Sequence, residues 1–449
     1  MLIERLRVTN FRSFRELDLE LSPLSVLVGA NASGKTNFVQ LFRFLRDVAN
    51  EGFESAIALQ GGVELVRNLR LGASQPLTIE MEGSFPSQPL SSPSRPTPVH
   101  YRYNLCVEFT RGRAGYRVAE ELLGVLFEPK EAEQYEVTLT RRGSRVEMEI
   151  PKVLFEDGHQ PHGNIVFSKV GVSQSLLQIS WILLPLEPGH IFASLVELGT
   201  FLRTIVAYDF NVHAMKRPAR LEARSRLEES GENLAVTLRE LFRSRERRRA
   251  FHRMLQQFLP EVQGVSVQVG AEKSVSYSLR EQHLGQRRLP SYRLSDGTVE
   301  LTALIVALYF TPTQLLIIEE PDRHLHPALI GRLMHHLKET VWRRQILVTT
   351  HNPEVVRHTP LESLLLVQRD SEGFSQITRP SENAHVKHFL QHELGLHELF
   401  ADNLEAVEHF CIFAAPCANI EDFRGTRTSC AQQLLESPLG FFSWILPIW

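Results

Sequence analysis

The chain has 449 residues, of which 43% are hydrophobic and 22% are charged. A chain of this length and composition is expected to fold into two or three structural units and is not a disordered tail. Its net charge of −3 excludes an overall nucleic-acid signature, so a contact with DNA would have to come from a local basic patch.

Targeting and cysteine patterns favour the cytoplasm. No apolar run reaches the roughly twenty residues that span a bilayer, and the N-terminus has no signal-peptide core. We therefore expect a cytoplasmic protein without a membrane contact.

The four cysteines, Cys106, Cys411, Cys417 and Cys430, form no CxxC pair. We expect free or buried thiols in that compartment, with a zinc site at the last three as the alternative.

The N-terminal residues lead into a phosphate-binding loop. Two short strands, predicted at 3–8 and 16–21, precede an apolar strand at 24–28. Residues 29–36 read GANASGKT, a complete GxxxxGK[ST] motif, and a helical stretch follows at 37–48. In such a loop, backbone N–H groups surround the phosphates, the lysine reaches the β- and γ-phosphates and the threonine hydroxyl ligates Mg²⁺. The predicted nucleoside triphosphate site comprises Gly29, Asn31, Ala32, Ser33, Gly34, Lys35, Thr36 and Asn37, with Thr36 on the metal.

The middle of the chain predicts a β lobe followed by a helical lobe. Alternating residues at 100–109 and 135–139 predict strands, and the Ser/Pro-rich stretch 86–98 predicts a surface loop. Helical spacing then covers 189–206 and 232–259. We therefore expect antiparallel strands before the helices.

The last third has the order typical of a parallel sheet. A strand at 315–319, a helix at 327–340 and a strand at 345–349 follow one another. Strands joined by helices favour parallel pairing. The predicted fold class is therefore α/β, with a mainly parallel sheet, an antiparallel β lobe and a helical lobe.

Two adjacent carboxylates end the first of these strands. The apolar run 315–318 is followed by Glu319 and Glu320, as in a Walker B strand. Glu319 would hold Mg²⁺ directly or through water, and Glu320 would polarise the attacking water as general base. Because neighbouring side chains of a strand point to opposite faces, the pair has to lie where the backbone turns. Pro321 supplies that turn.

Two further motifs complete a candidate hydrolysis site. Residues 349–353 read TTHNP, and a neutral His351 there could contact the γ-phosphate or the attacking water. Ser295, Asp296 and Gly297 precede an apolar helix at 299–309, and such residues at a helix N-terminus form a second anion site. Taken alone, the first motif is a structural histidine and the second an ordinary helix cap. Their order beside the phosphate loop carries the prediction.

This order of motifs resembles the ABC-type ATPases, and in particular their soluble RecF/SMC-like branch. The opening LRVTNFRSF at 6–14 and the loop GANASGKTN are similar to motifs of that branch. The box EEPDRHLHP at 319–327 and TTHNP at 349–353 are also similar to it. The segment 208–218 resembles a RecF-like subgroup. The resemblance covers nearly the entire chain and implies a phosphate-loop ABC-type ATPase head.

The resemblance also implies a two-lobed head that forms a homodimer with each ATP sandwiched between subunits. One subunit would supply the loop, the carboxylates and the histidine, and the other would supply Ser295, Asp296 and Gly297. Gln60 stands roughly where the family has its Q-loop glutamine, a further Mg²⁺ contact. ATP would then hold the dimer together, and hydrolysis would release it.

These assignments divide the chain into four predicted segments. A first ATPase lobe with the phosphate loop and a β subdomain covers 1–170, and a helical insertion that ends in the SDG motif covers 171–300. A second ATPase lobe with the Walker B strand and the histidine covers 301–383. A C-terminal extension covers 384–449.

Three functions of related ATPases are disfavoured. The stretch 36–295 has no sustained heptads, which argues against an SMC-type coiled coil. The tail has scattered acids without the DxD of a Toprim nuclease, and no membrane segment supports a transporter subunit. The apolar end 441–449 is too short to span a bilayer. It would pack on its own head, or it would dock a partner.

The strongest basic patch falls within the predicted helical region. Residues 243–253 contain six arginines and a single glutamate. Arginine suits phosphate because its contacts are bidentate and its charge is weakly hydrated. We hypothesise that the patch contacts duplex DNA when the ATP-bound dimer closes, and a solvated helix face is the alternative. The arginines are Arg243, Arg245, Arg247, Arg248, Arg249 and Arg253.

The sequence thus predicts a Mg²⁺-dependent ATPase that acts on DNA in repair or anti-phage defence. The alternative is an ATP-driven switch that controls a separate effector protein from the same operon without binding DNA. In that alternative, the C-terminal tail would be the docking segment.

Overall fold

The computed structural model describes residues 1–86, 97–110, 115–128, 134–149, 165–168, 171, 173–179 and 189–382. These residues belong to one compact unit, 1–401. The expected loop at 86–98 falls mostly outside the described residues, and the extension 384–449, with Cys411, Cys417 and Cys430, falls wholly outside them. In the described part of the chain, no helix is both long and apolar enough to cross a membrane.

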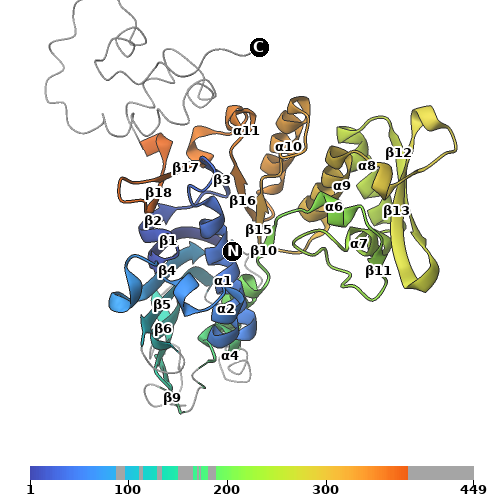
Figure 1. Cartoon of the computed structure of the whole chain (residues 1–449). Helices are drawn as coiled ribbons and strands as arrows, with labels where there is room; N and C mark the ends of the chain where they lie inside the picture. Colours follow the sequence, from blue (N-terminus) through green and yellow to red (C-terminus); the bar gives the residue numbers. More distant parts are fainter. Residues whose placement is uncertain are drawn as a thin grey trace, which may run out of the picture. The chain divides into compact units, whose positions relative to one another are not determined.

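A six-stranded sheet carries the phosphate loop (Figure 1). Its strand order is β10, β15, β16, β3, β17, β18, in which the first five strands are parallel and β18 is antiparallel. Every residue of β3, β15 and β16 is buried, so these strands read as apolar runs in the sequence. The mainly parallel sheet is therefore confirmed. The bounds are β3 Leu24–Val28, β10 Val206–Tyr208, β15 Leu315–Glu319, β16 Gln345–Thr350, β17 Leu364–Arg369 and β18 Ser375–Thr378.

An antiparallel sheet of eight described strands forms the predicted β lobe. The strands follow the order β2, β1, β4, β5, β6, β7, β8, β9. The stretches expected as strands at 100–109 and 135–139 lie in β5 and β7. The bounds are β1 Leu2–Phe11, β2 Phe14–Glu20, β4 Leu77–Ser84, β5 Thr97–Phe109, β6 Tyr116–Glu128, β7 Tyr135–Arg142, β8 Arg145–Glu149 and β9 Ile165–Ser168.

Helix α1, Lys35–Glu51, is buried on most of its sides. It belongs to a hydrophobic core that also contains residues of β1, β5, β15 and α5. Phe38 and Phe42 are fully buried, and their ring centroids lie 5.3 Å apart. The phosphate loop therefore leads into a helix that is held by dense packing. Nearby helices are α2 Phe53–Leu59, α3 Val63–Val66, α4 Leu176–Ile179 and α5 Gly189–Arg203.

The segment predicted as a helical lobe also contains a sheet, in which β13 pairs with β11, β12 and β14. The alternating sequence VQGVSVQV of β12 has the period of a strand, although no strand was predicted there. The strands are β11 Ala219–Arg220, β12 Val262–Val269, β13 Ser274–Glu281 and β14 Leu289–Pro290. The helices are α6 Val212–Met215, α7 Leu234–Leu241, α8 Arg245–Phe258 and α9 Asp296–Phe310.

Several helix boundaries differ from the prediction, among them those of α1 and α9, which are longer than the predicted 37–48 and 299–309. Helix α5 ends at Arg203, and Val206 instead begins the parallel strand β10. The stretch 232–259 is divided into α7 and α8, because the Ser244 hydroxyl accepts the N–H of Arg247 and starts a new helix. The remaining helices, α10 Pro327–Thr340 and α11 Pro353–Arg357, both begin at a proline that follows a capping side chain.

Candidate functional site

The carboxyl ends of β15, β16 and β3 meet at one edge of the parallel sheet. Glu319 is paired with Thr349, and Thr350 is paired with Val28. Strand β16 therefore separates the Walker B strand from the strand of the phosphate loop, and His351 follows β16 at this edge. In open α/β sheets this is the edge where ligands bind.

The phosphate loop is held in shape by β17 and β18. Arg369 Nε donates to the carbonyl of Ala32 at 3.1 Å, and Ser375 Oγ donates to the carbonyl of Ser33 at 2.6 Å. Gly34 has a φ of +123°, and a Cβ there would lie 2.1 Å from Ser375 Oγ. The loop conformation therefore requires glycine at this position.

Polar groups of the loop fit a phosphate ligand. Lys35 Nζ donates to the carbonyls of Gly29 at 2.7 Å and Ala30 at 2.9 Å, both in its own loop. Burial lowers the pKa of Lys35, and the nearby Glu320 opposes this shift. Ser33 Oγ is buried and has no hydrogen-bond partner among the described residues. A phosphate would supply acceptors for both groups. Asn31, Ala32 and Thr36 are exposed.

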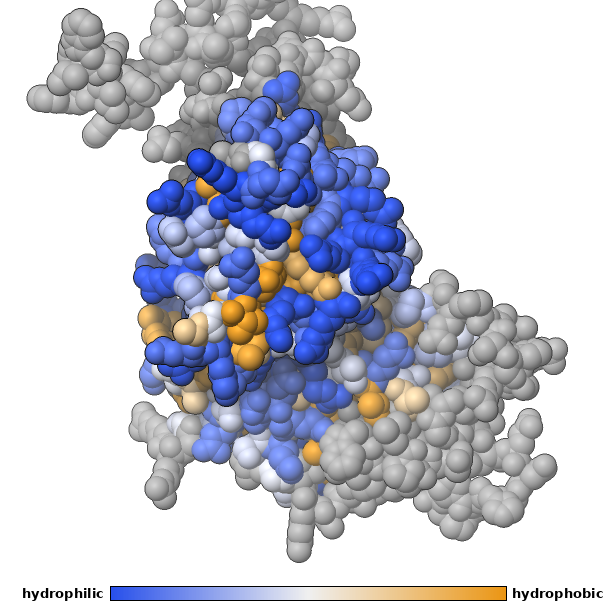
Figure 2. All heavy atoms as spheres, turned by 90° about the vertical axis from the view of Figure 1, so that its right-hand side faces the viewer, coloured by the Kyte–Doolittle hydropathy of each residue, from blue (hydrophilic) through white to orange (hydrophobic). Residues whose placement is uncertain are grey.

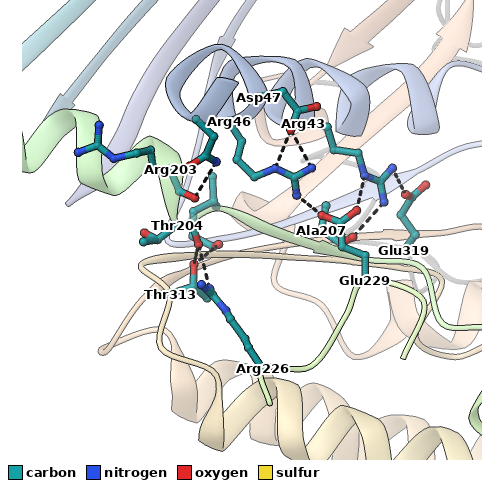
Figure 3. Close-up of polar contacts among 12 residues, drawn as sticks. Arg43, Arg46, Asp47, Arg203, Thr204, Ala207, Arg226, Glu229, Thr313 and Glu319 are labelled. Carbon is teal, nitrogen blue, oxygen red and sulfur yellow. Dashed lines mark hydrogen bonds and ion pairs between the residues drawn. The ribbon is translucent and has the colours of Figure 1, made fainter. Parts of the chain in front are cut away.

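The Walker B carboxylate is buried against an arginine of α1 (Figure 3). Arg43 Nη1 donates to Glu319 Oε1 at 2.9 Å, while its other nitrogens donate to Glu229 Oε2 at 3.1 Å and to the carbonyl of Ala207 at 2.9 Å. Burial raises the pKa of Glu319, whereas Arg43 and a hydrogen bond from Thr36 lower it. The two predicted metal ligands, Thr36 and Glu319, are therefore adjacent.

Arg43 was not predicted from the sequence. It lies two helical turns after Thr36, on the same side of α1. Its neighbours Phe42 and Phe44 are fully buried. The sequence signal for this role was a single arginine between two phenylalanines in the predicted helix, because a charge buried there requires a partner.

The predicted base and the predicted sensor are in contact. The backbone turns at Glu320, whose φ is +44°, before Pro321. Glu320 Oε1 lies 3.1 Å from His351 Nδ1, and Glu320 Oε2 accepts from Arg323 Nη2 at 3.0 Å. Burial acts to raise the pKa of Glu320, but the hydrogen bonds from Arg323 and His351 outweigh it and hold the pKa below its ordinary value. Glu320 is thus a carboxylate at neutral pH.

Asp322 fixes the tip that carries His351, a role that sequence reasoning missed. Thr350 Oγ1 donates to Asp322 Oδ1 at 2.9 Å, and the N–H of Asn352 donates to Thr350 Oγ1 at 3.0 Å. Asp322 is buried, and burial raises its pKa against the hydrogen bonds from Thr350 and Asn352. The available sequence signal for this role was the position of Asp322 in the motif EEPDRHLHP, two residues after Glu320.

The SDG motif lies at the N-terminus of α9. The exposed Ser295 caps the helix, Asp296 accepts from Lys216 Nζ, and a Cβ on Gly297 would lie 2.6 Å from the carbonyl of His324. Among the residues that the structure describes, no hydrogen bond or ion pair joins the motif to the phosphate loop of the same chain.

Gln60 contacts a different partner from the one expected of a Q-loop glutamine. Its Oε1 accepts from Arg12, and no described contact joins it to Thr36 or Glu319. Asn37 Nδ2 donates to Ser13 Oγ at 2.8 Å. Arg12 and Asn37 also line a pocket of about 300 Å³ beside the phosphate loop.

The six arginines of the predicted basic patch do not share one face. Arg243 precedes α8 and forms an ion pair with Glu240. Three of the others, Arg245, Arg248 and Arg249, line a pocket against β12 and β13. Arg247 and Arg253 are exposed on α8 and do not line that pocket.

A buried carboxyl lies one turn after the SDG motif. Glu300 is 3% exposed, and its Oε2 has no hydrogen-bond partner among the described residues. Burial raises the pKa of Glu300 to about 8, against the attraction of Arg323. The side chain is therefore mainly protonated at neutral pH.

Two family models match parts of the chain. The model described as "AAA domain, putative AbiEii toxin, Type IV TA system" matches residues 178–357. The model described as "AAA ATPase domain" matches residues 1–80.

Curated proteins match over shorter stretches. An uncharacterized protein of Methanocaldococcus jannaschii is 26% identical over 168 residues, which cover 34% of this chain and 44% of that protein. The DNA replication and repair protein RecF of an Arthrobacter species is 39% identical over 90 residues, which cover 19% of this chain and 22% of RecF. The chain thus spans less than half the length of these relatives. Among solved structures, an SMC head bound to the C-winged helix domain of ScpA is 14% identical, with 84% of this chain and 98% of that chain covered and a TM-score of 0.45.

Replacing Arg43 with Met should leave Glu319 buried without its cation. Breaking a buried ion pair costs about 3–5 kcal/mol of unfolding free energy. The pKa of Glu319 should rise further, so the variant should lose more stability than wild type as the pH rises above the ordinary value of 4.5. Arg46→Met is the matched control, because Arg46 contacts Glu229 and Asp47 but not Glu319. Urea unfolding of both variants at several pH values gives the test, and an equal dependence on pH would contradict a positioning role for Arg43.

Glu300→Gln should remove a pH dependence of stability. The folded protein retains a proton on Glu300 up to about pH 8, whereas the unfolded chain releases it near the ordinary value of 4.5. Stability should therefore fall as pH rises between these values, by up to about 1.4 kcal/mol per pH unit. Unfolding midpoints measured from pH 6 to pH 9 should show a flatter profile for Glu300→Gln than for wild type, and the exposed Glu246→Gln should behave like wild type. Parallel profiles for wild type and Glu300→Gln would exclude this role.

Proposed function

We propose that this chain, which AAA ATPase family models match over two parts of its length and which is similar to RecF, hydrolyses ATP to ADP and phosphate with Mg²⁺. The observation that carries this proposal is the contact between Glu320 and His351, 3.1 Å apart at the sheet edge that also holds the phosphate loop. The adjacency of Thr36 and Glu319 supports the metal assignment.

Each group has a role that its chemistry allows. Lys35 Nζ would donate to phosphate oxygens in place of the two loop carbonyls it now contacts. Thr36 and Glu319 would hold Mg²⁺, which when bound would neutralise phosphate charge. Glu320 would accept a proton from the attacking water, and His351 would orient that carboxylate.

Arg323 is a positioning residue in this proposal. Its guanidinium donates two hydrogen bonds to Glu320 Oε2, at 3.0 and 3.1 Å. These bonds keep the carboxylate ionised, but they also reduce its basicity. Release of Arg323, or exclusion of water around the site, would raise the proton affinity of Glu320 toward that of an effective base.

The proposed active form is a homodimer that sandwiches ATP. The exposure of Ser295, and the lack of a described contact between the SDG motif and its own phosphate loop, support the use of this motif by a second subunit. The N-terminus of α9, a helix of 15 residues, offers free N–H groups and a favourable dipole to phosphate.

We further propose that ATP turnover serves work on DNA, in repair or anti-phage defence in the cytoplasm. Relatives named DNA replication and repair protein RecF support DNA as the substrate. The alternative, an ATP-driven switch on an effector protein, is supported by the family description that names a putative toxin of a type IV system. Its expected docking segment lies outside the described residues.

Glu320→Gln should retain nucleotide binding and lose hydrolysis, because it keeps the shape of the side chain but removes the proton acceptor. Lys35→Ala should lose binding, because it removes the cation that contacts the phosphates. Binding of a fluorescent ATP analogue and phosphate release, measured on both variants, separate these outcomes. Hydrolysis by Glu320→Gln at the wild-type rate would refute the assignment of the base.

Mixing two inactive variants should restore activity if the site is shared between subunits. Lys35→Ala lacks a working phosphate loop, and Ser295→Arg lacks a working SDG motif. A mixed dimer would contain one site with both parts intact, so turnover should recover to roughly a quarter of wild type in an equal mixture. This estimate assumes random pairing of two-site dimers. No recovery, despite heterodimers detected by mass photometry, would contradict the sandwich.

A further inference from the structure

A pocket of about 520 Å³ lies between α8 and the sheet of β12 and β13. One wall is a single face of α8, since residues three and four positions apart on a helix are neighbours. The other wall comes from β12, β13 and the segment before β14. The basic and titratable side chains in the lining are Arg245, Arg248, Arg249, His252, Arg280 and Arg288.

The positive charge of this pocket is not balanced. No aspartate or glutamate lines it, and among the described residues none of its five guanidinium groups forms an ion pair. Nearby, Arg243 is paired with Glu240 and Lys273 is paired with Glu222. The pocket therefore gathers five positive charges without a described counter-charge, which a bound anion would supply.

The strand wall leaves space for a ligand. Gly264 is paired with Arg280 beside a register shift in the β12–β13 ladder, where it places no side chain opposite the guanidinium. A Cβ on Gly264 would lie 3.6 Å from His252 Cε1, so a larger side chain would extend into the space between helix and strand. His252 Nε2 accepts the N–H of Val265 at 3.2 Å, which fixes the ring on the pocket wall.

The surface around this lobe is mainly hydrophilic. Figure 2 turns the side of Figure 1 that carries β12 and β13 toward the viewer, and among the described residues hydrophilic ones cover most of this face around a smaller hydrophobic patch. Burial lowers the pKa of His252, and Arg248 lowers it further, so the ring remains a neutral acceptor. The arginines thus supply the positive charge of the pocket.

The walls of the pocket are attached to the helix that begins with the SDG motif. Helix α8 packs on α9, with the ring centroids of Phe251 and Phe310 at 6.3 Å. Arg288 is followed directly by β14, by the short helix η6, Ser291–Arg293, and then by α9. Ser291 Oγ donates to the carbonyl of Lys216 at 2.8 Å, and Lys216 Nζ donates to Asp296. A shift of Arg288 toward a ligand would therefore act on the start of α9.

We propose that this pocket binds clustered phosphate groups and that its occupation increases ATP turnover through α9. The coupling, but not the binding, rests on the proposed ATPase function. Arginine binds phosphate oxygens in bidentate pairs, and five guanidinium groups suit two or more phosphates. A nucleic-acid strand and a small polyphosphate both offer this chemistry. The proposal adds Arg280 and Arg288 to the basic residues predicted from sequence and excludes Arg243, Arg247 and Arg253.

The test compares two double variants of the full chain that lose equal charge. Arg280→Gln with Arg288→Gln alters the pocket, whereas Arg247→Gln with Arg253→Gln alters exposed arginines of α8 outside it. Binding of a labelled single-stranded oligonucleotide and of inorganic tripolyphosphate is measured with Lys35→Ala added to every protein for this step, which disables the phosphate loop as a competing site, at salt concentrations from about 50 to 200 mM. ATP turnover is then measured with and without each ligand, and circular dichroism checks folding.

The proposal predicts that the pocket variant binds at least about tenfold more weakly than wild type and that the control loses much less. Ligand-stimulated turnover should disappear only in the pocket variant, with basal turnover retained. Binding of tripolyphosphate alone would identify a small polyphosphate as the ligand, and binding of both would identify a nucleic-acid strand.

Equal losses of binding in the two variants, or unchanged binding in both, would contradict the proposed phosphate pocket. Selective loss of binding with stimulation retained would overturn the coupling. Absence of basal turnover in wild type would count against the ATPase function and leave the binding result intact.

Discussion

The parallel pairing of β15, β16 and β3 determines where the proposed catalytic groups lie. Parallel strands end at a common edge, so residues that are far apart in sequence, such as Glu319 and the loop after Val28, meet there. These strands are buried over their whole length. The strand order places His351 between the Walker B carboxylates and the phosphate loop. The order of the strands therefore determines where the site lies, and the individual side chains determine its chemistry.

Buried charge is the second constraint on this site. Arg43 and Arg46 of α1 are paired with Glu319, Glu229 and Asp47 (Figure 3). Each of these ions would be costly to bury alone, so α1, β15 and the segment before α7 have to keep their arrangement. The network joins the phosphate-loop helix to the Walker B strand. Any displacement of Glu319 would have to be accommodated at Arg43.

Some elements were predicted from the sequence at both ends because their signals are local. A strand at 24–28 and a helix at 327–340 match the structure at both ends, since a buried strand reads as an apolar run and a proline marks the first helical turn. The pairing of Arg43 with Glu319 was not predictable, because the two residues are 276 positions apart and meet only through packing.

The basic patch shows the same limit. The predicted patch included Arg243, Arg247 and Arg253 because they are close to the other arginines in the sequence. On a helix, however, neighbouring residues point in different directions. Arg280 and Arg288 line the pocket from a strand and from a loop, and no local sequence pattern predicted that they lie beside α8. The contact of Gln60 with Arg12 likewise depends on tertiary packing. The roles of the catalytic residues and the use of the SDG motif in trans stay predictions.

The most direct test of the central claim is phosphate release from ATP by the purified full chain, measured with Mg²⁺ and again with an excess of EDTA. The account predicts steady multiple turnover with Mg²⁺, none with EDTA, and restoration when Mg²⁺ is returned. A folded protein that binds ATP but releases no phosphate in Mg²⁺, with or without oligonucleotide, would contradict the hydrolytic role assigned to this sheet edge.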